Sequence, residues 1–312
     1  MAVLQFISSN SAIIQGAVSL GLIFSIMSIG VFITFRVLQM PDLTVEGSLL
    51  LGAAMTARLI SQDVNPFAAT LAAILVGCAA GFASGFLHTM FKIPSILAGI
   101  LTMVSSYSIA IRIMGTSNIP LLPRRVVSIF TFLQELEGME RAYAVLIVSF
   151  AVVLIVCCLV YCFMGTEFGS ALRATGNNQQ MVRAQGINTN IMIIACLMLS
   201  NGLVGLAGSI LAQYQGFASV DMGAGTIVYG LAALIIAEVL FPVRRFWTRL
   251  ISIVIGSIIY RLVIAYALSV DFMPSTDLRL VTATLVAFAL VLPLIREKIV
   301  KMFKKLYKRG AA

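Results

Sequence analysis

Long apolar segments alternate with short polar ones along the chain, and the period-two alternation of a membrane β-barrel is absent. A hydrocarbon core about 30 Å thick takes about 20 apolar residues of helix. Backbone groups in lipid must also be bonded internally, which helices achieve. The pattern therefore predicts an all-α polytopic membrane helical bundle of about nine spans, within a range of eight to ten. The spans are expected at 11–34, 43–60, 66–90, 94–114, 142–164, 189–214, 226–241, 250–270 and 280–295.

Two of these spans have unusual features. The span 43–60 overlaps the polar run "QMPDLTVEGS", and 226–241 is among the shortest. A short apolar helix can be tilted, re-entrant or extended into its neighbours. The sequence leaves these alternatives open for 226–241.

The composition agrees with a membrane protein. Hydrophobic residues make up 60% of the 312 residues and charged residues 11%, whereas roughly a quarter of a typical soluble domain is charged. No low-complexity linker interrupts the pattern. Residues 1–312 are therefore expected to form a single transmembrane domain that ends in a basic tail at 296–312.

The distribution of Lys and Arg predicts how the chain crosses the membrane. If the C-terminus is cytoplasmic, the inner segments hold 14 of the 21 basic residues. The first apolar run follows no basic region and no clear cleavage site, so it is expected to be a retained signal anchor. These features predict an N-terminus outside and a C-terminus inside. The net charge of +9 then indicates contact with anionic lipid headgroups and no nucleic-acid partner.

A helix break with two acids precedes and enters the span 43–60. Pro41 ends a helix, Asp42 can cap the next one, and Glu46 lies in its first turn, where the helix dipole favours a carboxylate. Transporters also build substrate or gating sites from such half-helices. The sequence leaves capping and a role in the pathway open as alternatives.

The candidate pathway or gating residues are Asp42, Glu46, Asn201 and Arg261. Asn201 and Arg261 are included because burying an unpaired polar group inside a span costs free energy. Arg261 must face an aqueous cavity or pair with an acid, which can be either acid of the helix break or Glu238. Glu238 itself is expected to form an interfacial salt bridge with Arg244 or Arg245.

Small residues in two spans predict where helices pack, because helices in lipid associate through close backbone approach. The runs are "GCAAGFASG" and "SNGLVGLAGSILAQ". Their glycines are Gly77, Gly81 and Gly85 in the first run, and Gly202, Gly205 and Gly208 in the second. In the first run the four-residue steps align the glycines on one helix face.

Groups that could hold a metal or perform covalent chemistry are scarce. The five cysteines all fall inside predicted spans without metal-ligand spacing, and His88 has no acid or cysteine nearby. An intramembrane enzyme would need a nucleophile with a base, or a metal. Because no G-x-x-x-x-G-K-[ST] phosphate loop occurs, the chain is expected to bind no ATP in that manner and to carry no cofactor, so that energy must come from a partner or a gradient.

A polar island, residues 165–188, interrupts the apolar pattern. It is too polar to insert, and the distribution of charge predicts that it faces the cytoplasm. Helix-like spacing after Gly169 breaks at Gly176 and Asn177, and a second turn over 179–185 is closed by Gly186. The residues alone leave a basic loop and a short docking helix as alternatives.

The island also carries a resemblance to a known family. "GTEFGSALRATGNNQQMVRAQGINTN", followed by "IMIIACLMLSNGLVGLAGSILAQYQG", resembles the signature region of ABC-transporter permeases of the branched-chain amino acid and ribose importer superfamily. "MPDLTVEGSLLLGAAMTA" and "KIPSILAGILTM" are similar to two other segments of that family. Together these segments extend the resemblance over most of the chain.

The resemblance implies a permease subunit of a binding-protein-dependent importer in a bacterial plasma membrane. Two copies would form the pathway, two ATP-binding cassette subunits would dock inside, and an extracytoplasmic binding protein would deliver the solute. The island would carry the cytoplasmic coupling helix, with arginines binding acids of the ATPase and glycines letting the backbone turn. The ATPase contacts would fall on Glu167, Gly169, Arg173, Ala174, Gly176, Asn177, Arg183 and Gly186.

The chain departs from the family pattern in one region. Many members have GG-x-x-x-x-x-GG where this chain reads "GLAALIIAEVLFPVRRFWTRL". "PDLTVEG" is similar to a subgroup associated with lipoprotein-type binding proteins and with amino acids, including tryptophan or tyrosine. The alternative is an ion-coupled secondary transporter or a channel, for which Asp42, Glu46 and Arg261 are a thin set of residues.

Overall fold

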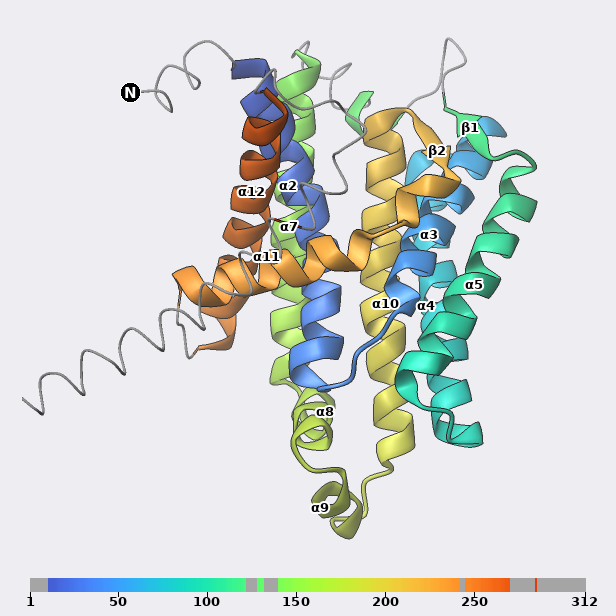
Figure 1. Cartoon of the computed structure of the whole chain (residues 1–312), viewed down its shortest axis with the longest axis vertical. Coiled ribbons are helices and arrows are strands. Elements are labelled where there is room, and N and C mark those ends of the chain that lie inside the picture. Colours follow the sequence, from blue (N-terminus) through green and yellow to red (C-terminus); the bar gives the residue numbers. More distant parts are fainter. Residues whose placement is uncertain (1–10, 122–127, 132–139, 242–244, 270–283, 285–312) are drawn as a thin grey trace, which may run out of the picture.

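The computed structural model describes residues 11–121, 128–131, 140–241, 245–269 and 284, and these residues form a bundle of long helices (Figure 1). The long helices are α2 (Ser11–Phe32), α3 (Thr44–Ser61), α4 (Pro66–Phe91), α5 (Ser95–Met114), α7 (Arg141–Gly165), α10 (Thr189–Gln215), α11 (Thr226–Leu240) and α12 (Phe246–Ser269). The short ones are η1 (Ile33–Val37), α8 (Glu167–Asn177), α9 (Gln179–Ala184) and η2 (Val220–Gly223).

Two three-residue strands close one end of the bundle. β1 (Asn118–Pro120) and β2 (Phe217–Ser219) pair antiparallel, with Ile119 opposite Ala218. Gly216, at φ +76°, ends α10 in the left-handed region directly before β2. A glycine adopts this conformation without the steric cost that a Cβ would add.

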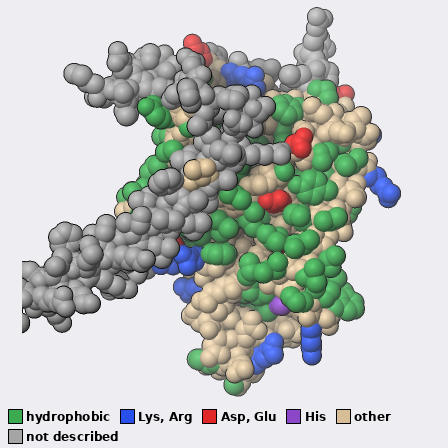
Figure 2. All heavy atoms as spheres, in the orientation of Figure 1, with side chains coloured by type: hydrophobic (Ala, Val, Ile, Leu, Met, Phe, Trp, Pro, Cys, Tyr) green, Lys and Arg blue, Asp and Glu red, His purple; other side chains and the backbone are tan. Residues whose placement is uncertain are grey.

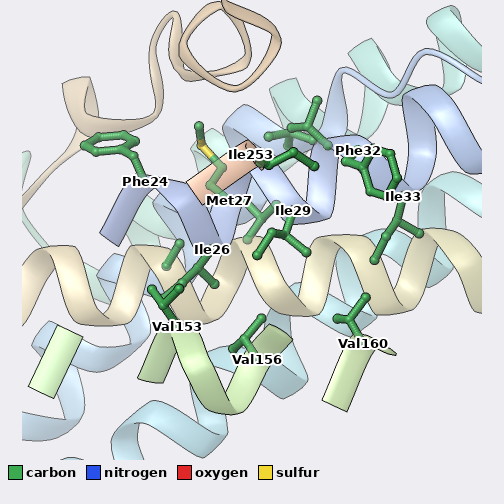
Figure 3. Close-up of a cluster of buried hydrophobic side chains, with 14 of the residues drawn as sticks. Phe24, Ile26, Met27, Ile29, Phe32, Ile33, Val153, Val156, Val160 and Ile253 are labelled. Atoms are coloured by element: carbon green, nitrogen blue, oxygen red, sulfur yellow. The ribbon is translucent and has the colours of Figure 1, made fainter. Parts of the chain in front are cut away.

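The core gathers around α2, whose sequence is apolar on all sides and which is largely buried by its neighbours. Ile26, Ile29 and Ile33 of α2 lie on the side of the α7 valines Val153, Val156 and Val160, and Met27 lies beside Ile253 of α12 (Figure 3). α10 packs against α2 on one side and against α3 and α4 on the other. Because α10 contacts both groups of helices, it connects the two halves of the bundle.

Among the described residues, seven helical segments are long and apolar enough to cross a membrane. They are Ile13–Val37, Pro66–Phe91, Ser95–Met114, Arg141–Gly165, Thr189–Gln215, Val220–Leu240 and Phe246–Ala267. Each overlaps one of the nine predicted spans. Of the other two, 280–295 lies outside the described residues apart from Thr284, and 43–60 requires a correction.

The predicted span 43–60 forms α3, which is not one of the seven candidate spans. α3 begins part of the way along the bundle, at the end of a chain segment that climbs from the lower end of α2 (Figure 1). Thirteen of its 18 residues are buried. It is apolar because protein surrounds it, which hydropathy alone does not distinguish from a lipid environment.

α11 runs across the bundle at a steep angle to α10 and α12 (Figure 1). With η2 it makes the apolar segment Val220–Leu240, which is longer than the range 226–241 read from the sequence. The sequence left open whether this helix is tilted, re-entrant or extended. In the structure it is tilted and is extended at its start.

The flanks of the bundle expose large apolar side chains. Leu71 of α4, Val104 of α5 and Leu159 of α7 are 59%, 57% and 64% exposed. Hydrophobic side chains spread over the face seen in Figure 2, and Lys and Arg side chains lie at its lower end, at its upper end and at its right edge. In water such a surface would be costly, so it indicates contact with lipid.

Candidate functional site

A buried polar network joins the start of α3 to the middle of α10. Asp42 accepts a hydrogen bond from the Thr44 backbone N–H at 2.9 Å and another from Asn201 Nδ2 at 2.7 Å. Asn201 Nδ2 also donates to Leu197 O at 3.0 Å, and its Oδ1 accepts from Ser48 Oγ at 2.7 Å. Asp42 and Asn201, which the sequence proposes as pathway residues, therefore contact each other.

Glu46 serves the start of a different helix. Its carboxylate is hydrogen-bonded by the backbone N–H groups of Gly225 and Ile227, at the N-terminus of α11. A carboxylate at a helix N-terminus is stabilised by the helix dipole and by the unsatisfied N–H groups there. The two acids thus fix the starts of two helices inside the bundle, Asp42 at α3 and Glu46 at α11.

A second polar network lies nearer the other end of α10. Gln213 Nε2 donates to Thr70 Oγ1 at 3.0 Å, and Gln213 Oε1 accepts from the Ile129 backbone N–H at 3.1 Å. Ser209 donates to Thr70 at 3.1 Å and accepts from Thr56 at 2.8 Å. These bonds satisfy polar groups on α3, α4 and α10 that lipid could not satisfy.

The six glycines named from the sequence lie where helices meet. A Cβ on Gly77 would overlap Asn201 O, and one on Gly81 would overlap Leu197 O. A Cβ on Gly205 would lie 2.6 Å from Ala73 O. At the remaining positions, Gly85 would meet Ile194 Cα, Gly202 would meet Cys78 Sγ and Gly208 would overlap Leu49 O. The backbones of α4 and α10, and of α3 and α10, therefore touch without intervening side chains.

Arg261 pairs with none of the three expected acids. Its guanidinium carbon lies 4.2 Å from the ring centroid of Phe24 and 5.1 Å from that of Tyr229. Arg261 Nε has no hydrogen-bond partner among the described residues. Among the described residues the charge is stabilised by aromatic faces, and Asp42, Glu46 and Glu238 are bonded to other groups.

Glu238 forms its ion pair with Arg36 and none with Arg245, while Arg244, the other expected partner, lies outside the described residues. Arg36 lies in η1, 202 residues away in sequence. The pair connects the ends of α2 and α11, and both side chains are partly exposed, at 43% and 33%. Sequence proximity favoured the neighbouring arginines, whereas the path of α11 across the bundle brings Glu238 to η1.

The polar island forms two short helices at one end of the molecule (Figure 1). Thr166 Oγ1 accepts from the Gly169 N–H at 3.2 Å to cap α8, and Asn178 Oδ1 accepts from the Met181 N–H at 3.1 Å to cap α9. Gly186, at φ +84°, makes the turn toward α10. The two helices and the closing glycine follow the pattern read from the sequence, but the break lies at Asn178, since the predicted Gly176 and Asn177 still belong to α8.

Two of the glycines in the island have a different role from the one expected. Gly169 and Gly176 are helical and do not turn the chain. A Cβ on Gly169 would overlap Phe163 O, and one on Gly176 would overlap Val37 O. They let α8 approach α7 and η1, and only Gly186 of the three supplies a turn.

The outer face of α8 and α9 is polar and accessible. Glu167, Arg173, Asn177 and Arg183 are exposed, whereas Ala174 is half-buried. Arg173 donates to Ser170 Oγ at 3.2 Å within α8, and Arg183 Nε donates to Thr189 Oγ1 at 2.6 Å at the start of α10. Gln39 Nε2, which the sequence did not single out, donates to Asn177 Oδ1 at 3.3 Å.

Groups of three or more metal-ligating side chains are not found among the described residues. Cys157 and Cys196 are buried, Cys78 is partly buried, and Cys158 and Cys162 are exposed. His88 Nδ1 lies 2.7 Å from Ile93 O, which ties the end of α4 to the turn before α5.

The site therefore consists of helix starts and polar networks. Ser48 and Thr70 belong to them but had no distinguishing signal, because serine and threonine are common in membrane helices.

Comparison with known proteins gives one family. A family model described as "Branched-chain amino acid transport system / permease component" matches residues 13–292. The chain is 42% identical over 265 residues to the tyrosine transport system permease protein of Clostridioides difficile (strain R20291), covering 85% of this chain and 86% of that one.

More distant relatives extend the comparison. An uncharacterized protein of Rickettsia prowazekii (strain Madrid E) is 32% identical over 225 residues, 72% of this chain and 76% of its own. The autoinducer 2 import system permease protein LsrC of Yersinia pseudotuberculosis serotype O:3 (strain YPIII) is 25% identical over 198 residues, 64% of this chain and 54% of its own. No solved structure matches the chain.

Proposed function

Since the chain belongs to the family of permease components of branched-chain amino acid transport systems, we propose that it forms the pathway of an ATP-driven importer for an amino acid. It is a multi-pass protein of a bacterial plasma membrane and a permease subunit of an ABC importer. The 42% identity to a tyrosine transport permease supports an amino acid cargo, aromatic ones included.

The proposed partners divide the work of transport. Cytoplasmic ATP-binding cassette subunits hydrolyse ATP, a lipoprotein outside the membrane delivers the amino acid, and a second copy of the chain completes the pathway. The N-terminus lies outside and the C-terminus inside, so that α8 and α9 face the cytoplasm, as the positive-inside distribution of Lys and Arg supports.

We assign the contact with the ATPase to the exposed face of α8 and α9. The observation that carries this assignment is a polar helix pair at one end of an otherwise apolar bundle, with one face free and the other docked on the bundle. Glu167, Arg173, Asn177 and Arg183 offer charged and amide groups on the free face. Arginine binds carboxylates in a bidentate manner, which gives such a contact strength and orientation.

The docked face supports a route from α8 into the bundle. Gly176 lets α8 touch Val37 at the end of η1, and Asn177 accepts a hydrogen bond from Gln39 two residues later. The same segment continues to Asp42, which is bonded to Asn201 in α10. A displacement of α8 would therefore act on the segment that precedes α3, where a half-helix begins inside the bundle.

The test is charge reversal of Arg173 in the assembled transporter. Arg173→Glu should reduce co-purification of the ATPase and lower ATP-dependent uptake of labelled tyrosine into proteoliposomes at least tenfold, since one charge-assisted contact of about 1.5 to 3 kcal/mol is lost and a repulsion is added. Tyrosine binding by the lipoprotein should not change. Competition of other, unlabelled amino acids with the uptake of labelled tyrosine measures which amino acids the transporter accepts.

Arg112→Glu is the matched control, because Arg112 is also exposed but lies in the last turn of α5, away from α8. It should leave ATPase association intact. Normal uptake in the Arg173→Glu protein would remove the coupling assignment. Uptake by the purified chain alone, driven by an ion gradient without ATPase, would favour a secondary transporter.

A further inference from the structure

A pocket lies beside α8, and one of its lining residues is Arg173, which also belongs to the proposed ATPase contact. Its volume is about 1060 Å³, and it opens between the end of α7, α8 and the start of α12. Two guanidinium groups, Arg173 and Arg245, line it together with Tyr161 and Trp247. The Tyr161 and Trp247 rings contact each other edge to face at 5.3 Å.

The two arginines have no carboxylate partner in the part of the chain that the structure describes. Among the described residues neither forms a salt bridge, and the only side-chain hydrogen bond of Arg173 goes to the neutral hydroxyl of Ser170. A pocket that holds two uncompensated positive charges attracts an anion. Its chemistry selects a negatively charged ligand of about the size of a phosphate-containing headgroup.

Most of the remaining wall of the pocket is apolar, with Thr166 and Thr248 adding two hydroxyl groups, and it continues along α7 into the lipid-facing surface. Cys158 and Cys162 line the pocket, and Leu154, Ile155 and Leu159 on the same helix are 50%, 54% and 64% exposed. Tyrosine and tryptophan side chains are enriched in membranes at the depth of the lipid headgroups, because one part of each side chain is apolar and another part is polar. The pocket thus lies at the boundary between headgroups and acyl chains.

We propose that this pocket binds an anionic glycerophospholipid of the leaflet on the α8 side, with the headgroup phosphate between Arg173 and Arg245 and an acyl chain along α7. The charge of the arginines excludes a preference for a zwitterionic lipid, and the apolar wall favours a lipid over free phosphate. The proposal requires only that the chain lies in a membrane. It does not depend on the ATPase assignment, and it puts a lipid beside the coupling helix.

Trp247 provides the test, because it is the only tryptophan of the chain. The purified full-length protein is reconstituted in vesicles that contain equal small fractions of either dibrominated phosphatidylglycerol or dibrominated phosphatidylcholine, and tryptophan fluorescence is excited selectively. Bromine quenches tryptophan only in contact. The apparent affinity of the anionic lipid for the site should exceed that of the zwitterionic lipid by about fivefold for each arginine involved.

Arg245→Gln should reduce this preference about fivefold, and Arg245→Lys should retain most of it because the charge is kept. Lys92→Gln is the matched control, since Lys92 is exposed at the C-terminus of α4, at the same end of the bundle but not in the pocket. Equal quenching by the two lipids, or an equal loss of preference in Arg245→Gln and Lys92→Gln, would overturn the proposal. Relief of quenching by millimolar inorganic phosphate would identify free phosphate as the ligand and overturn it as well. The assay contains no ATPase, so its failure leaves the proposed transport function untouched.

Discussion

The side chain of Asn201 connects α10 to the segment 42–48, which lies more than 150 residues away in sequence. It donates to Asp42 and to Leu197 O, and it accepts from Ser48. All of these groups are buried. Hydrogen bonds in such surroundings contribute modestly when made, but a buried group left without a partner costs its full desolvation.

Replacement of Asn201 by alanine should therefore be more damaging than the loss of one amide suggests. Asp42 Oδ2 and Ser48 Oγ would both lose a partner, and the stability should fall by about 1 to 3 kcal/mol for each group left unsatisfied. Thermal unfolding in detergent, followed by the reaction of the buried cysteines with a thiol dye, measures this. Gln215→Ala, an exposed change at the end of the same helix, should leave the melting temperature within about 1 °C.

The sequence identified the polar residues of the interior but not their partners. Asp42, Glu46, Asn201 and Arg261 were selected because polar groups are expensive inside spans. The Asp42–Asn201 bond joins residues 159 positions apart, and the ring contacts of Arg261 depend on the packing of α2, α11 and α12. Contacts between residues so far apart in sequence depend on how the helices pack, and hydropathy does not encode that packing.

At the scale of elements, α4 and α10 meet through backbone atoms. Gly81 lies against Leu197 O with no room for a side chain. Gly81→Ala should shift or separate the two helices at a cost of about 1 to 3 kcal/mol, the usual penalty for overpacking. Its effect appears as lower abundance in the membrane and a lower melting temperature.

Ala83→Val is the control for this change, because Ala83 is exposed on the same helix and its enlargement meets no neighbour in the bundle. If Gly81→Ala were as stable as Ala83→Val, the close contact of α4 and α10 would not exist in the protein.

The helix α8 also packs closely against η1, and this contact can be tested by substitution. Gly176→Ala should loosen α8 from Val37, because a Cβ would overlap Val37 O. We expect ATP-dependent uptake to fall several-fold while the ATPase still co-purifies, since the free face of α8 is unchanged. Gly165→Ala, at a helical glycine with no atom within 4 Å of its Cβ, should transport normally.

If the Gly176→Ala and Gly165→Ala proteins transported equally well, the contact of α8 with η1 would not transmit a displacement of α8 to the bundle. Loss of ATPase co-purification in Gly176→Ala would instead mean that the residue shapes the binding surface itself.

The elements differ in how far the sequence predicted them. The breaks of the polar island were readable because capping residues and Gly186 act locally. The interior start of α3 and the oblique course of α11 were not, since apolar side chains serve equally well against lipid and against protein. Glu46 was assigned correctly to the first turn of α3, yet its bonds to the start of α11 depend on the approach of another helix.

At the scale of the whole molecule, the described residues of the bundle form two large hydrophobic clusters and a small third one between α11 and α12. One large cluster surrounds α2 with α7, α11 and α12, and the other joins α3, α4 and α5, while residues of α10 enter both. The polar helices α8 and α9 protrude at one end (Figure 1). The orientation of that end determines whether the proposed coupling is possible at all.

Site-directed labelling tests the orientation. In a protein whose five cysteines are replaced, Asn177→Cys should react with an impermeant maleimide only in inside-out vesicles, and Gln62→Cys only in right-side-out vesicles. Both positions are exposed, and they lie at opposite ends of the bundle. Reaction of Asn177→Cys from the outside would reverse the orientation and exclude an ATPase contact on α8.

The glycine contacts between α4 and α10 also limit how this chain can change in length. One inserted residue rotates everything beyond it in a helix by about 100°, so an insertion near Gly77 or Gly202 would replace glycines at the contact with residues that carry side chains. Gains and losses of residues among relatives should therefore be absent from these two helices and accumulate in the segment 115–140, which joins α5 to α7.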